Sequence, residues 1–82
     1  MLEANVYVRL KKTITDPQGL AIKHALDSLD YKDIEQVRVG KVITLRLDTK
    51  DKKTATRQID EMSKKVLANP IIEDYSFDIK GE

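Results

Sequence analysis

The chain has 82 residues, enough for one domain over residues 1–82 with a thin hydrophobic core. Its 15 basic and 14 acidic residues nearly cancel, which argues against a general nucleic-acid binder. The absence of cysteine excludes disulfides and thiolate metal ligands, and no apolar run approaches the roughly 20 residues of a membrane span, so we predict a cytoplasmic protein that binds neither nucleic acid nor membrane.

The first two predicted elements are a strand and a helix. Apolar and polar residues alternate over Val6–Leu10, a period typical of a strand with one buried face. Asp16 can cap the helix that follows, and Pro17 fits the first helical position because no N–H donor is missed there. One arc of about 100° on this helix is apolar, the width of a core-facing stripe. The stripe comprises Ile22, Ala25, Leu26 and Leu29.

The segment from Ile34 to Asp48 is predicted to form a hairpin. Valine residues alternate before Gly40-Lys41, and isoleucine and leucine residues alternate after it. Gly40 supplies the permissive backbone that a tight reversal requires. The alternating residues are Val37, Val39, Ile43, Leu45 and Leu47.

A second helix, from about Thr54 to Ala68, and a last strand complete the chain. Asn69-Pro70 ends this helix, because the residue before proline is disfavoured in helical geometry. Alternation over Tyr75–Ile79 predicts the strand. The narrow apolar stripe of the helix comprises Ala55, Ile59, Met62 and Val66.

The resulting element order is βαββαβ. It predicts a ferredoxin-like α+β fold, with both helices on one face of a four-stranded antiparallel sheet. The opposite face would mix apolar, arginine and tyrosine side chains, a composition that suits an interface. We therefore predict a homo-oligomer with a dimer as its basic unit, which joins either through this face, burying Tyr7, Val42 and Ile72, or through sheet edges. The full set on this face is Tyr7, Arg9, Arg38, Val42, Thr44, Arg46, Ile72, Asp74 and Ser76.

No constellation of catalytic, cofactor-binding or metal-ligating residues is predicted. His24 is the only histidine, and no spacing of histidine, aspartate and glutamate residues suggests a metal site. None of the three serines has the sequence context of a nucleophile. Gly40-Lys41 lacks the rest of a phosphate-binding loop. Arg38 and Lys41 are either solvated or available to an anionic partner.

Three segments together resemble the PurS family of phosphoribosylformylglycinamidine synthase, over about Val6 to Ile79. Ser63 departs from the family's usual cysteine, and Asp30 stands where a glycine often ends the first helix, although aspartate tolerates a left-handed cap at modest strain. The segments are Asp16-Pro17-Gln18-Gly19, Val37-Arg38-Val39-Gly40-Lys41 and Leu67-Ala68-Asn69-Pro70-Ile71-Ile72-Glu73-Asp74-Tyr75.

The resemblance implies a small non-catalytic subunit of an ATP-dependent C–N ligase in purine biosynthesis. Such a subunit bridges a glutaminase, PurQ, and a synthetase, PurL, and helps to shield ammonia transfer between them. ATP and magnesium would belong to the synthetase and not to this chain. The residues predicted to contact the partner proteins are Arg38, Gly40, Lys41, Asn69, Glu73 and Tyr75.

Two other functions share this element order. A small-molecule sensor of the ACT type would bind its ligand at the loop near Thr13–Gly19, and amino-acid binding would identify it. A ferredoxin-like RNA-binding module needs exposed aromatic residues on its central strands, where Tyr7 is the only candidate.

Overall fold

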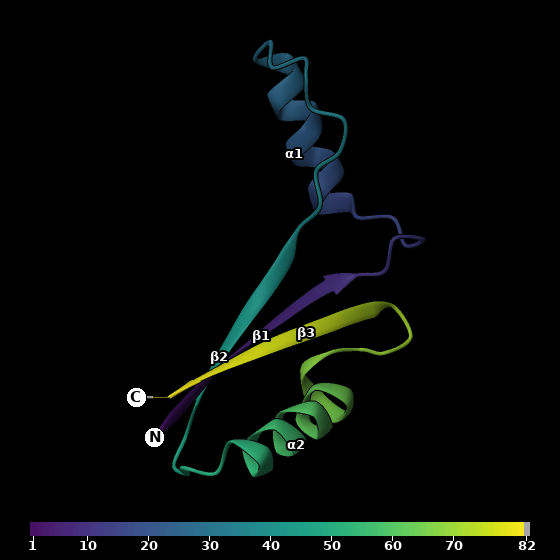
Figure 1. The fold of residues 1–82 in the computed structure, drawn as a ribbon. Coiled ribbons are helices and arrows are strands. Elements are labelled where there is room, and N and C mark those ends of the chain that lie inside the picture. Colours follow the sequence, from purple (N-terminus) through teal and green to yellow (C-terminus); the bar gives the residue numbers. More distant parts are fainter. Residues whose placement is uncertain (82) are drawn as a thin grey trace.

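The computed structural model describes residues 1–81, which form a three-stranded antiparallel sheet and two helices (Figure 1). The α+β class is as predicted. The strands follow the spatial order β2-β1-β3, so β1 lies in the centre. Both ends of the chain lie together, because Leu2 pairs with Gly81 across β1 and β3 (Figure 1). The elements are β1 (Leu2–Leu10), α1 (Pro17–Ser28), β2 (Gly40–Leu47), α2 (Lys52–Met62), the π-helical segment η1 (Ser63–Leu67) and β3 (Glu73–Gly81).

The predicted four-stranded sheet is wrong, because the hairpin at Gly40-Lys41 does not form. Residues 34–39 belong to no strand, and β2 begins at Gly40, opposite Arg9 of β1. A Cβ atom on Gly40 would lie 2.8 Å from the carbonyl oxygen of Val8. Glycine is therefore needed at this position for the close approach of two strands and not for a turn.

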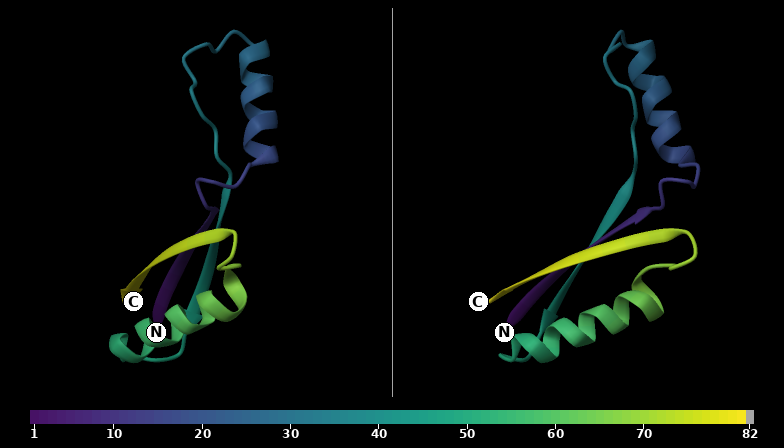
Figure 2. Two further views of the ribbon diagram at one scale, coloured as in Figure 1. Left: turned by 90° about the vertical axis from the view of Figure 1, so that its right-hand side faces the viewer. Right: turned by 45° about the vertical axis from the view of Figure 1, so that its right-hand side comes forward.

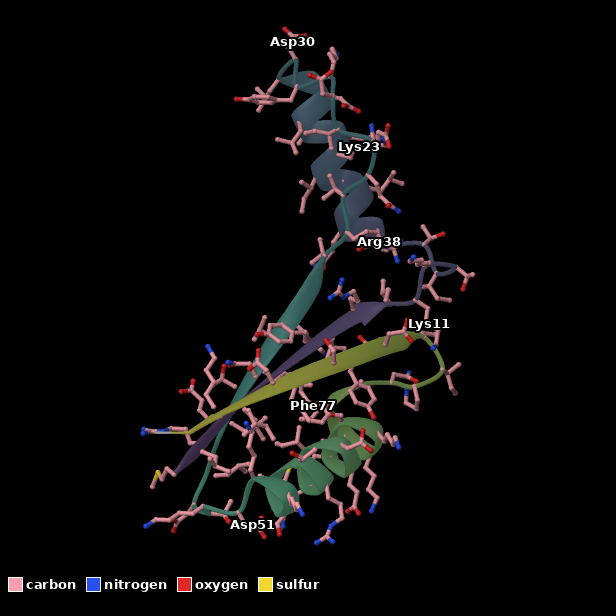
Figure 3. All side chains as sticks on the ribbon, in the orientation of Figure 1. Lys11, Lys23, Asp30, Arg38, Asp51 and Phe77 are labelled. Carbon is pink, nitrogen blue, oxygen red and sulfur yellow. The ribbon has the colours of Figure 1, made fainter. Side chains whose placement is uncertain are left out.

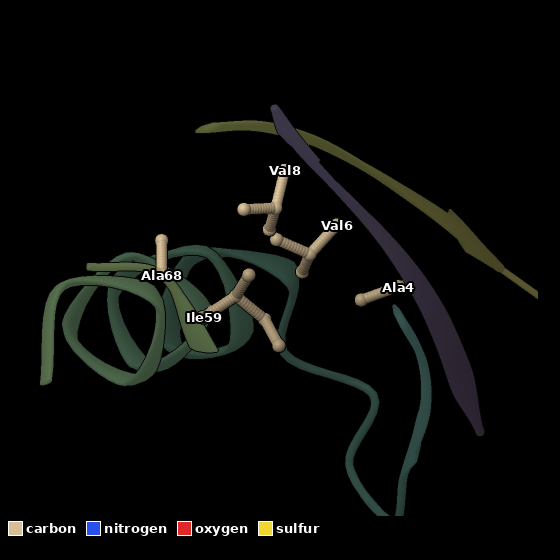
Figure 4. Packing of buried hydrophobic residues seen from close by; sticks show 5 residues of the cluster. All are labelled: Ala4, Val6, Val8, Ile59 and Ala68. Carbon is tan, nitrogen blue, oxygen red and sulfur yellow. The ribbon is translucent and has the colours of Figure 1, made fainter. Parts of the chain in front are cut away.

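The hydrophobic core lies between α2 and one face of the sheet. Val6 and Val8 of β1 point towards Ile59 of α2, and all three side chains are almost fully buried (Figure 4). Ala4 and Ala68 complete the cluster (Figure 4). The buried face of the first strand is as predicted.

The second helix ends in a π-helical turn that changes which residues face the core. In η1 the N–H of Ala68 donates to the carbonyl oxygen of Ser63 at 2.9 Å, a bond that spans five residues instead of four. Ser63 and Ala68 are therefore buried, whereas the side chain of Val66 is 80% exposed. The prediction that Val66 shares the buried stripe is wrong for this reason.

Helix α1 does not cover the sheet. It extends away from the strands, with residues 31–39 running back beside it (Figures 1 and 2). We call residues 17–39 the arm. The molecule measures 49 × 28 × 14 Å and has a radius of gyration of 16.3 Å, whereas a compact chain of this length would have about 12 Å. The prediction that both helices lie on one face is thus wrong.

Most of the apolar stripe of α1 remains in solvent, and only Leu26 is half-buried. Ile22 is 43% exposed and Leu29 is 69% exposed, and Ala25 is exposed as well. Leu20 and Tyr31 add further exposed apolar surface to the arm. In the single chain, no other element therefore covers this helix face, although its apolar pattern is typical of a face that packs in a core.

No helix within residues 1–81 has the length and apolar character needed to traverse a bilayer.

Candidate functional site

The arm joins the sheet at a junction held by Arg38. The guanidinium group donates to the carbonyl oxygens of Ile14 at 3.1 Å and Lys11 at 2.9 Å, with a longer bond of 3.3 Å to Leu10. Arg38 is half-buried and lies at the base of α1 (Figure 3). The residue therefore ties the loop after β1 to the chain that enters β2, and it does not project from a hairpin tip.

Asp16 forms the second part of the junction. One carboxylate oxygen caps α1 by accepting from the N–H of Gly19 at 2.9 Å, and the other accepts from the N–H of Val39 at 2.6 Å. The bond from Val39, followed by that from Gly19 and the charge of Arg38, lowers the pKa of the buried Asp16 carboxyl below its ordinary 3.8. The N-cap predicted at Asp16 is confirmed, and the second bond joins the start of α1 to the chain that enters β2.

Gly19 completes the junction because a side chain would not fit there. A Cβ atom on Gly19 would overlap the carbonyl oxygen of Val37. The glycine of the Asp16-Pro17-Gln18-Gly19 segment thus permits the first turn of α1 to touch the returning chain. We use "junction" below for Asp16, Gly19, Arg38 and Val39.

Three of the predicted partner-binding residues line one hollow beside the junction. Gly40, Lys41 and Glu73 border a space of about 270 Å³, together with Asp16 and Val39. Lys41 pairs with Val8, so it lies on the same sheet face as the core, but its side chain is exposed.

The other predicted partner residues take part in local contacts. The N–H of Asn69 donates to a carboxylate oxygen of Glu73 at 2.7 Å, and the Asn69 side chain accepts from the N–H of Ile71 at 3.1 Å. The hydroxyl of Tyr75 donates to Asp60 of α2 at 2.6 Å. This bond is the main reason that the pKa of Asp60 is lowered and that of Tyr75 is raised.

The sheet face opposite α2 carries a polar network. Tyr7 donates its hydroxyl hydrogen to Asp78 at 2.8 Å, and Asn5 links Asp78 at 3.4 Å to the hydroxyl of Thr44 at 2.8 Å. Val42 lies opposite Tyr7 on this face and is 59% exposed. The sequence analysis missed Asn5 and Asp78, although their alternation with apolar neighbours could have placed them here.

Two residues assigned to this face lie elsewhere. Arg38 belongs to no strand, and Ile72 precedes the first residue of β3. The N–H of Lys11 donates to the Ile72 carbonyl oxygen at 2.9 Å, so Ile72 lies beside the end of β1.

Within residues 1–81 no group of three or more histidine, cysteine, aspartate or glutamate side chains is placed to hold a metal ion. His24 is exposed on α1.

Comparisons with known proteins give one consistent family. Residues 3–81 match the family model "PurS: Phosphoribosylformylglycinamidine (FGAM) synthase". The chain is 40% identical over 80 residues to the phosphoribosylformylglycinamidine synthase subunit PurS of Bacillus subtilis. The aligned region covers 98% of this chain and 94% of that protein.

Solved structures agree with this result. Crystalline PurS of Methanocaldococcus jannaschii is similar with a TM-score of 0.89 and 32% identity, covering 100% of this chain and 99% of that one. A chain of the PurLQS structure from Thermotoga maritima has the same fold, with a TM-score of 0.84 at 23% identity, over 98% of this chain and 99% of that one. These matches do not favour the small-molecule sensor. Because the family model spans nearly the whole chain, this protein belongs to the PurS family of phosphoribosylformylglycinamidine synthase subunits.

Proposed function

We propose that this chain is the non-catalytic subunit that bridges a PurQ-type glutaminase and a PurL-type synthetase in the cytoplasm. The observation that carries the proposal is the family match over residues 3–81. In this role the chain supports assembly and shields ammonia as it passes from the glutaminase to the synthetase. ATP and magnesium would bind to the synthetase.

The proposed partner contacts lie around the hollow that Gly40, Lys41 and Glu73 border. Lys41 offers an exposed cation there, and the hollow is open enough to receive a partner side chain. Arg38, Asn69 and Tyr75 would act on the same contact indirectly, because their polar groups are already bonded within the chain.

A homodimer is the proposed basic unit. The exposed stripe of α1 supports it, since Ile22 and Leu29 are apolar residues at core spacing that this chain does not cover. A closed pair would bury such surface without forming a growing chain of subunits. Tyr7, Val42 and Ile72 remain the proposed interface residues, but only Tyr7 and Val42 share the face opposite α2, and Ile72 lies beside the end of β1.

The bridging role is tested by reconstitution with the matching glutaminase and synthetase. Glutamine-dependent synthesis should require this chain, which alone should neither hydrolyse ATP nor release ammonia from glutamine. Replacing Lys41 with glutamate should weaken assembly, whereas Lys53→Glu, at an exposed lysine of α2 far from the hollow, should not. Full glutamine-dependent turnover without this chain would refute the proposal.

A further inference from the structure

The chain between α2 and β3 carries the two most solvent-exposed large apolar side chains of residues 1–81. Ile71 is 81% exposed, and Val66 in η1 is exposed to nearly the same degree. Pro70, which lies between them in the sequence, is exposed as well. We call Val66, Pro70 and Ile71 the turn patch. It lies at the end of α2 that is remote from both ends of the chain (Figure 1). Single exposed apolar residues are common, but this turn has three further features.

The first feature is that hydrogen bonds hold the turn in one conformation. The N–H groups of Ile72 and Glu73 donate to the carbonyl oxygen of Asn69 at 3.1 and 2.7 Å. The Asn69 side chain accepts from the N–H of Ile71 at 3.1 Å, and the N–H of Lys11 ties the turn to the end of β1 through the Ile72 carbonyl oxygen at 2.9 Å. A protein that binds Ile71 therefore loses little free energy in ordering the backbone around it.

The second feature is the π-helical turn, which places Val66 in the patch. If the period of α2 continued, Val66 would lie on the stripe of Ile59 and Met62 and would face the sheet. η1 instead buries Ser63 and Ala68 and turns Val66 outward. π-helical turns are rare and occur frequently at functional sites. The chain thus exposes an apolar residue that a regular helix would bury.

The third feature is the positive charge beside the turn patch. Lys65 directly precedes Val66 in η1. The bond from the Lys11 N–H continues the β1–β3 register by one residue pair, which sets the next residue, Lys12, beside Ile71. Both Lys12 and Lys65 are exposed, and neither forms an ion pair within residues 1–81.

The acidic side chains near the turn patch do not neutralise these two lysines. Each of them interacts with another group of the chain, which is a different lysine, a tyrosine hydroxyl or a backbone N–H group. These acidic residues are Asp60, Glu61, Glu73 and Asp74. A second copy placed on the patch about a two-fold axis would bring the free lysines of both copies together, and like charges repel. Carboxylates of a different protein would be attracted instead.

We propose that the turn patch docks a different protein, which receives Ile71 and Val66 in an apolar pocket bordered by carboxylate groups. The inference rests on the proposed bridging function, because a bridge needs two separate contact surfaces. Lys41 lies on β2, whereas Ile71 precedes β3, so the two surfaces lie on opposite sides of the central strand β1. An apolar centre with a charged rim matches the usual composition of a protein–protein contact.

The docking site is tested by titrating the chain into a mixture of the matching glutaminase and synthetase. With Ile71→Glu, the chain concentration for half-maximal assembly should rise at least about tenfold, because the new carboxylate meets those of the partner. Val66→Glu should act in the same way. Gln58→Glu adds the same charge at an exposed site near the middle of α2 and should leave the titration unchanged. Native mass spectrometry measures the complexes, and circular dichroism verifies that each variant is folded.

Neutral variants separate the apolar contact from the charged rim. Ile71→Ala should weaken assembly without changing its dependence on ionic strength, since only apolar contact is lost. Lys65→Gln should make assembly less sensitive to ionic strength, because one attraction to a carboxylate is removed. A dependence on ionic strength that is the same for Lys65→Gln as for the unmodified chain would contradict the acidic border of the partner's pocket.

The docking site and the bridging function fail in different ways. Unchanged assembly of folded Ile71→Glu and Ile71→Ala variants overturns the docking site and leaves the bridging function standing. If Ile71→Glu reduces self-association of the chain alone in light scattering, a second copy covers the patch, and the docking of a different protein is overturned. If the unmodified chain joins neither the glutaminase nor the synthetase, both the bridging function and the docking site are overturned.

Discussion

Gly19 sits in the first turn of α1, where glycine is normally a poor choice. Replacing glycine with alanine in a helix usually stabilises it by up to about 1 kcal/mol. Here the new Cβ would overlap the Val37 carbonyl oxygen, a backbone atom that cannot move without shifting the arm. The structural requirement is therefore the opposite of the intrinsic helix propensity.

Gly19→Ala should consequently destabilise the protein, by about 1 to 3 kcal/mol, the usual cost of overpacking. Urea denaturation at one fixed protein concentration measures the change. Gly81→Ala is the control, since among residues 1–80 its Cβ would come no closer to a non-adjacent residue than the 4.0 Å that separates it from a Leu2 methyl group. A stabilising Gly19→Ala change would mean that the junction is looser than described.

Asp16 should make the free energy of unfolding depend on pH in the acidic range. The pKa of the Asp16 carboxyl is lowered in the folded chain. Its contribution to the free energy of unfolding is therefore complete above the ordinary pKa of 3.8, and it disappears as the pH falls through the lower folded pKa. Asp16→Asn cannot ionise, so the difference in denaturation midpoint between the two proteins should shrink as the pH is lowered below 3.8. A constant difference across this range would show that the charge of Asp16 contributes nothing.

Residue-scale features were partly readable from the sequence. Asp16 was recognisable as a cap, and Asp30 does adopt the expected left-handed backbone, with φ at 70°. The N–H groups of Asp30 and Tyr31 donate to the carbonyl oxygens of Asp27 and Leu26, which closes the helix end. The hydrogen bond from Val39 to Asp16 could not be predicted from the sequence. It joins residues 23 apart, which come close only because the arm returns to the base of α1.

At the scale of elements, the π-helical turn has the clearest effect. Sequence periodicity assumes 3.6 residues per turn, and η1 breaks that period after Met62. Propensity and alternation contain no signal for the extra residue. Three of the four predicted strands are present and α2 begins at Lys52, close to the predicted Thr54, whereas the strand predicted before Gly40 and the facing of Val66 were wrong.

Val66→Lys should therefore change the free energy of unfolding by no more than about 0.5 kcal/mol, as expected for an exposed site. Ile59→Ala, on the buried side of α2, should cost about 2 to 5 kcal/mol. Chemical denaturation of both variants provides the comparison. A large loss for Val66→Lys would imply a regular α-helix in solution, with Val66 against the sheet.

Considered as a whole molecule, the chain is extended, which the sequence could not indicate. The apolar stripe of α1 predicted a helix packed on its own sheet, but such a stripe has the same pattern whether or not its own sheet is what it packs against. Val37 and Val39 were predicted to pair in a hairpin with the strand that follows Gly40-Lys41, but alternation alone does not determine the partner of a strand. Residues 34–39 belong to no strand, so both the predicted strand and its hairpin partner were wrong.

The melting temperature should rise with protein concentration, because association stabilises the folded chain by mass action. Val42→Asp should release monomer if the pair forms through the face that carries Tyr7, and should leave the dimer intact if it forms through sheet edges. Calorimetry at several dilutions and light scattering of Val42→Asp measure the two effects. A monomer whose melting temperature is independent of dilution would refute association altogether.

The arm and the sheet should also differ in local stability, because they share few buried contacts. The buried side chains of β1 and α2 form one cluster, whereas α1 contributes only Gly19 to the fully buried set. Segments with few buried contacts open at a fraction of the global free energy, often as one cooperative unit. The arm can therefore unfold while the sheet persists. In that partly open state the junction bonds of Arg38 and Asp16 are broken, and a protease can reach residues 29–39 without disturbing the core.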